Sequence, residues 1–150
     1  MAEDSEHLTH PVLGTLSWLP EFSHWFTQFR LPSGEWLDVI VDPADDDRHE
    51  FLLRAAEMFR WAFDNERRVL ADAMRAELLE LYNDTWRQGE EPVLSAEGLT
   101  ALLEWTLLTV SASEIVPVEF SYQAGELFGG HDIAVEVDAE LQFCDIDLRG

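Results

Sequence analysis

The stretch VPVEFSYQAGELFGGHDIAVEVDAELQFCDIDLR, residues 116–149, alternates apolar and polar side chains in three short runs. The runs cover residues 116–124, 131–139 and 141–149, and turn-forming residues separate them. A period of two residues is typical of a strand with one buried face and one face in solvent. The stretch therefore predicts three neighbouring strands of a mainly antiparallel sheet.

The residues before this stretch predict helices and one more strand. From residue 48 to residue 86, apolar side chains recur at steps of three and four, which indicates helix. A helix of about 40 residues is long for a globular protein, so we expect a break at FDNER, residues 63–67. The acidic residues 45–47 suit the start of that helix. Ser95 is the predicted N-cap of a further helix in 95–105, and residues 106–113 predict the strand.

Three more strand-like runs lie near the N-terminus, at residues 12–19, 23–31 and 35–42. The segment LPSGE between the last two is short enough for a hairpin. The chain therefore predicts an α+β fold, with a mainly antiparallel sheet built from three N-terminal and four C-terminal strands. Two to three helices lie between these groups in sequence and pack on one face. Residues 1–10 are predicted to be a disordered acidic tail, and residues 11–150 a single domain.

The charge of the chain restricts its partners. Thirty-one acidic residues stand against nine basic residues, all of them arginines, and the formal net charge is -22. Binding of nucleic acid or of an anionic membrane needs clustered cations, so neither is an expected partner. A biased amino-acid composition explains the charge without a function, whereas a basic partner protein would make use of it.

Cysteine usage and the absence of targeting signals indicate a cytoplasmic protein. Cys144 is the only cysteine, which excludes an internal disulfide and fits a reducing compartment. The chain shows neither the pattern of a signal peptide nor an apolar run long enough to span a membrane. Acidic neighbours disfavour the thiolate of Cys144, so we predict an inert cysteine in a strand.

Acidic side chains on the polar face of residues 116–149 form a candidate docking surface. If the three strands pair, these carboxylates share one solvent-exposed face, where a basic protein is an electrostatically complementary partner. The alternative to a docking role is that any sheet with one solvent-exposed face carries polar residues on that face. The residues concerned are Glu119, Glu136, Asp138, Asp145 and Asp147.

His131 and Asp132 complete the candidate binding residues. They follow the pair Gly129 and Gly130, which permits a tight turn or a close approach of backbone. A histidine beside an aspartate suits proton transfer or metal binding, but neighbouring residues of a strand point to opposite faces. We therefore expect a turn with a structural histidine. The sequence predicts no catalytic residue, no metal ligand and no cofactor, because it contains none of the common catalytic or phosphate-binding motifs.

Three segments carry a resemblance to known proteins. They are HPVLGTLSW at residues 10–18, LYNDTWRQG at residues 81–89 and LFGGHDIAVEVDAELQFCDIDLRG at residues 127–150. Together they resemble a family of small bacterial proteins of unknown function, over nearly the whole chain. The resemblance implies a shared fold and transfers no catalytic residue. Small acidic proteins of this kind are often found near bacterial toxin and immunity genes.

These observations favour a non-catalytic, acidic protein-binding module, in its most specific form an immunity-type inhibitor of a basic toxin. One alternative is a small hydrolase or metal-dependent enzyme that uses His131, Asp132 and carboxylates of the sheet. A weaker alternative is a nucleic-acid mimic whose carboxylates imitate the spacing of phosphates.

Overall fold

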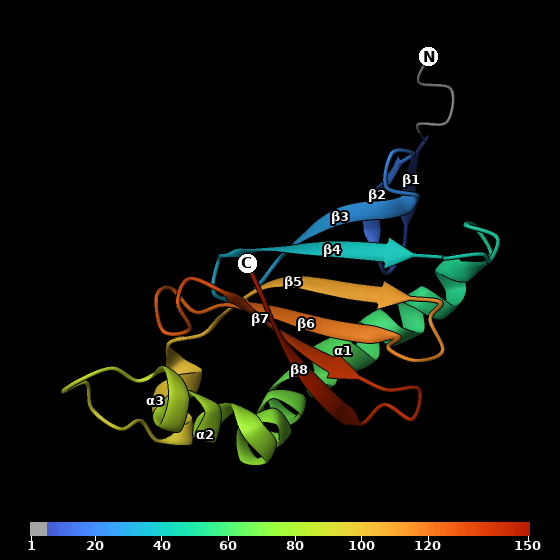
Figure 1. Cartoon of the computed structure of the whole chain (residues 1–150). Helices are drawn as coiled ribbons and strands as arrows, with labels where there is room; N and C mark the ends of the chain where they lie inside the picture. The colour runs from blue at the N-terminus through green and yellow to red at the C-terminus, as the bar shows by residue number, and fades with distance from the viewer. Residues whose placement is uncertain (1–5) are drawn as a thin grey trace.

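A computed structural model describes residues 6–150 as an α+β fold, in which a long helix packs on one face of an eight-stranded sheet (Figure 1). The order of the strands in the sheet is their order in the sequence. The strands are β1 (Glu6–His10), β2 (Gly14–Leu19), β3 (His24–Arg30), β4 (Trp36–Asp42), β5 (Glu104–Ser111), β6 (Val118–Gln123), β7 (Asp132–Val137) and β8 (Phe143–Arg149).

Seven strand pairs join the eight strands, and only the central pair, β4 with β5, is parallel. The helical segment lies between these two strands in the sequence and returns the chain to the same end of the sheet, as a parallel connection requires. The mainly antiparallel α+β sheet predicted from the sequence is confirmed. The division into three and four strands is not, because each half contributes four.

The additional strand is β1, which lies within the predicted disordered tail, residues 1–10. Leu8 pairs with Leu16 of β2 and packs against the core. The Glu6 carboxylate accepts hydrogen bonds from Arg48 at 3.1 Å and from the His49 ring at 2.7 Å. These contacts hold residues 6–10 in the sheet, while the remainder of the predicted tail lies outside the described residues.

The helical segment runs through the predicted break at residues 63–67, so that prediction is wrong. It begins with α1 (Phe51–Ala73) and continues through the π-helical turn η1 (Met74–Leu78), α2 (Leu79–Leu81) and a second π-helical turn, η2 (Tyr82–Trp86). A separate short helix, α3 (Ala96–Ala101), has Ser95 as its N-cap, as predicted, with the Ser95 hydroxyl accepting from the Gly98 N–H.

The predicted acidic start of the long helix is also present. One oxygen of the Asp47 carboxylate accepts hydrogen bonds from the N–H groups of His49 at 2.9 Å and Glu50 at 3.0 Å. These two bonds are the main reason that the pKa of Asp47 lies below its usual value. The first N–H groups of the helical segment therefore find an acceptor before α1 begins.

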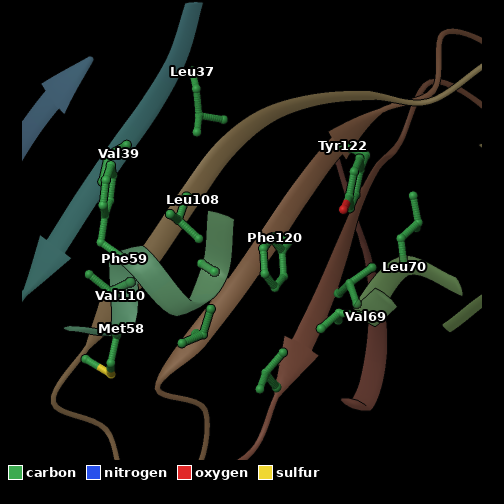
Figure 2. Packing of buried hydrophobic residues seen from close by; sticks show 14 of the residues in the cluster. Leu37, Val39, Met58, Phe59, Val69, Leu70, Leu108, Val110, Phe120 and Tyr122 are labelled. Atoms are coloured by element: carbon green, nitrogen blue, oxygen red, sulfur yellow. The ribbon is translucent and has the colours of Figure 1, made fainter. Parts of the chain in front are cut away.

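The core fills the space between the sheet and α1. Alternate residues of the central strands turn toward the helix and are fully buried, as their two-residue period predicts. Figure 2 shows strand residues such as Val39, Leu108 and Phe120 facing Phe59, Val69 and Leu70 of α1. The buried Tyr122 hydroxyl of β6 also donates to the Glu66 carboxylate of α1 at 2.6 Å. Burial and that carboxylate raise the pKa of Tyr122 well above its usual value.

Among the helices of the described residues, none is both long enough and apolar enough to cross a membrane.

Candidate functional site

The face of the sheet opposite α1, here called the open face, carries a marked excess of carboxylates. Strand register and alternation place eight acidic residues on it, against the two arginines Arg30 and Arg149. The acidic residues are Asp38, Asp42, Glu104, Glu119, Asp132, Glu136, Asp145 and Asp147.

The carboxylates are closest together on β6, β7 and β8. Glu119 lies opposite Glu136, and Glu136 lies opposite Asp145, so three like charges adjoin on neighbouring strands. Arg149 lies among them. Its guanidinium donates to both oxygens of Glu119, to Asp147 at 3.0 Å and to Glu136 at 3.5 Å. One arginine therefore compensates part of the charge of this cluster.

The charge of Glu136 is only partly compensated by Arg149. Partial burial, the carboxylates of Glu119 and Asp145, and more weakly Asp147 raise the pKa of Glu136, while Arg149 acts in the opposite direction. The net upward direction means that the folded protein does not fully stabilise this carboxylate. An added cation near Glu136 would favour its ionised form.

We expect Glu136→Gln to raise the free energy of unfolding at pH 7 by about 0.5 kcal/mol, a value reduced for solvent screening. The raised pKa gives the sign, because the folded protein binds this proton more tightly than the unfolded chain. Glu136 therefore costs stability as the pH rises from its ordinary pKa of 4.5 through the folded value. Urea unfolding at several pH values measures the difference, which should shrink toward zero below pH 4.5. A destabilised variant at pH 7 would contradict the prediction.

Asp138, another predicted residue, occupies a different position from the one expected. It follows β7 in the turn to β8, where its carboxylate accepts hydrogen bonds from the N–H groups of Glu140 and Gln142. Cys144 lies in β8, the last strand, and is exposed beside the register shift between Glu136 and Val137. Desolvation and neighbouring carboxylates raise the pKa of its thiol, which agrees with an unreactive cysteine.

His131 lies in the turn before β7, away from the carboxylates of the open face. Its Nδ1 lies 2.7 Å from the carbonyl oxygen of Phe128, and its ring centroid lies 5.8 Å from that of Trp86. Trp86 belongs to the helical segment, whereas Asp132 lies on the open face opposite Arg149. Within residues 6–150, no three His, Cys, Asp or Glu side chains are arranged to hold a metal ion.

The negative charge of the protein is distributed unevenly along the chain. The helical segment and its approach, residues 48–87, contain seven arginines and eight carboxylates and are nearly neutral. The rest of the chain has only two arginines against 23 carboxylates. Both of these arginines lie on the open face. The excess of acid therefore lies outside the long helix that packs behind the sheet.

Sequence reasoning missed Arg149, Asp38 and Asp42 as residues of this face, and it placed Glu104 in the predicted helix 95–105, whereas Glu104 begins β5 on this face. Arg149 could have been found, since it continues the alternation of Asp145 and Asp147 along the last strand. Asp38 and Asp42 could not be assigned to the same face as Glu119. That placement depends on the parallel pairing of β4 with β5, which the sequence pattern does not reveal.

Comparison of the chain with models of known protein families, with curated proteins and with solved structures finds no match. The resemblance to a family of small bacterial proteins therefore stays a prediction.

Proposed function

We propose that the protein is a non-catalytic binding module whose open face docks a basic protein; the most specific form of the proposal is an immunity-type inhibitor of a basic toxin. The observation that carries it is the separation of charge, with a nearly neutral helical segment behind a sheet whose open face has eight carboxylates and two arginines. Such a field accelerates encounter with a cationic partner and orients it toward this face.

The open face also offers apolar contact beside its charge. Phe26 of β3 lies opposite Ile40 of β4, and both side chains are partly exposed. Leu107 of β5 lies opposite Asp38 on the same face. Protein interfaces commonly combine an apolar centre with a charged rim. On the open face, partly exposed apolar residues of β3–β5 lie beside the carboxylates of β6–β8, so a partner that covers the face contacts both.

The geometry favours this proposal over its two alternatives. A hydrolase would need His131 to act with Asp132, but His131 contacts a backbone carbonyl and Trp86 while Asp132 lies on the open face. A nucleic-acid mimic would need an uninterrupted row of negative charge. Arg149 interrupts the row by contacting Glu119, Glu136 and Asp147.

The test compares two charge-reversed variants that have the same net charge. One double variant, Asp132→Lys with Asp145→Lys, changes the open face. The control double variant, Glu90→Lys with Glu97→Lys, changes one residue in the loop that follows η2 and one residue in α3. The probe is a fluorescein-labelled arginine-rich basic peptide, and its anisotropy is measured at about 20 mM and about 300 mM NaCl. We expect the open-face variant to bind about tenfold more weakly at low salt and the control less than about threefold more weakly.

Two results would overturn the proposal. Equal losses in the two variants would mean that the peptide senses only net charge and not this face. Failure of the unaltered protein to bind the peptide at low salt would remove the basis for a basic partner. Thermal melts of both variants establish that each is folded before binding is compared.

A further inference from the structure

A hollow of about 290 Å³ opens on the open face across its central strands. Along one row of the register, Asp38 lies opposite Leu107, Leu107 opposite Ser121, and Ser121 opposite Ala134. The two smallest side chains of this row are neighbours, and larger residues lie on both sides of them. The hollow follows from this order of side-chain sizes, because the strands themselves are continuously paired.

The floor of the hollow contains the hydroxyl of Ser121, a residue that is only 8% exposed. Among residues 6–150, no fully buried side-chain nitrogen or oxygen lacks a hydrogen-bond partner, so this hydroxyl keeps its access to solvent through the hollow. A donor that enters the hollow would replace water at the hydroxyl.

The rim of the hollow is suited to a cation. The Asp38 carboxylate accepts one hydrogen bond, from Gln28 Nε2 at 2.9 Å, and has further acceptor capacity. The exposed Asp132 lies on the opposite side, and Leu107 supplies an apolar wall. Arg149 also borders the hollow, but its guanidinium is already engaged by Glu119, Glu136 and Asp147.

We propose that this hollow receives one arginine side chain of the basic partner, an inference that rests on the proposed docking function. The aliphatic part of the arginine packs against Leu107, and its guanidinium donates to the Ser121 hydroxyl and to the carboxylate of Asp132 on the neighbouring strand, while Asp38 adds negative charge at the far rim. Arginine suits the site better than lysine, because its planar group carries five donors in fixed directions and reaches several acceptors at once. The volume of about 290 Å³ lies at the lower end of the range for ligand pockets and is sufficient for a single side chain.

The test titrates ¹⁵N-labelled protein with N-acetyl-arginine amide and follows backbone amide shifts. We expect saturable shifts at Leu107, Ser121 and Ala134 with a Kd of about 1 mM, and at least about threefold weaker binding of N-acetyl-lysine amide. The neutral isostere N-acetyl-citrulline amide should cause no saturable shift. Ser121→Leu fills the hollow without a change of charge and should abolish the shifts. Thr109→Leu, on the same face but outside the hollow, should retain them.

The outcomes separate this inference from the proposed function. If the arginine-rich peptide binds the open face while the amide shifts stay unchanged, or are confined to β8, the hollow is not the site and only this inference is overturned. If the amide occupies the hollow while the open-face charge reversal leaves peptide binding unchanged, the docking function fails and the hollow stands as an arginine site. Should Ser121→Leu not fold, Asp132→Asn replaces it and is expected to weaken binding at least about threefold.

Discussion

Replacing Phe128 with alanine is expected to lower the free energy of unfolding by about 4 kcal/mol, close to the upper end for a buried aromatic residue. Phe128 is fully buried in the turn between β6 and β7. Its ring lies 5.7 Å from that of Tyr82 and 6.1 Å from that of Trp86, both in the last turn of the helical segment. These large rings cannot easily move into the space that alanine would leave, so most of the cavity should persist.

Urea unfolding of the variant and of the unaltered protein measures this loss. The matched control is Phe22→Ala, because Phe22 is 64% exposed and stacks only on His24. We expect the control to change the free energy of unfolding by less than about 0.5 kcal/mol. A loss below about 1 kcal/mol for Phe128→Ala would show that the turn does not close the core against the helical segment, contrary to its burial.

The sequence predicted the faces of the strands well, because alternation is a local property. Val118, Phe120 and Tyr122 alternate with polar residues in β6, and the structure buries all three against α1. The polar residues between them accordingly lie on the open face. Once β6 and β7 are taken as neighbouring strands, alternation assigns Glu119 and Glu136 to one surface without knowledge of the exact register.

The predictions that failed depended on contacts between distant segments. The break expected at residues 63–67 does not occur, because that stretch is held by the sheet. Phe63 packs against Phe29 and Trp105, and Glu66 accepts the hydrogen bond of Tyr122. Tertiary contacts here outweigh the weak helix propensity of the local sequence. The polar segment that forms β1 was missed for the same reason, since Glu6 finds its hydrogen-bond partners, Arg48 and His49, 42 and 43 residues away.

The candidate site was only partly predictable. Its acidic residues follow from alternation, but the hollow depends on which residues meet across four strands. Ser121 and Ala134 are ordinary strand residues in the sequence, and only the register makes them neighbours. Local irregularities of the strands also cannot be predicted from a sequence period of two residues. The bulge beside Glu136 leaves Cys144 without a paired residue on β7, and a second register shift separates Trp105 from Leu107.

The second prediction with a large expected effect concerns Gly129, in the turn formed by Gly129, Gly130 and His131. Its φ of +65° is one that residues with a side chain rarely adopt, and an added Cβ would lie 2.9 Å from Cζ3 of Trp86. Gly129→Ala is therefore expected to cost about 3 kcal/mol, of which about 1 arises from the backbone and the remainder from the collision with a rigid ring. The control Gly125→Ala also has a positive φ, +55°, but its Cβ would meet no atom within 4 Å. It should cost only the backbone part.

A double-mutant cycle decides whether the indole is responsible. Trp86→Phe removes the outer ring that contains Cζ3, so Gly129→Ala should cost about 2 kcal/mol less in that background than in the unaltered protein. Urea unfolding of the four proteins provides the coupling energy. Equal costs in the two backgrounds would mean that the glycine is required by its backbone conformation alone. A large coupling would mean that Gly129 is there to let Trp86 close over the turn, which gives the glycine and the neighbouring His131 a structural role.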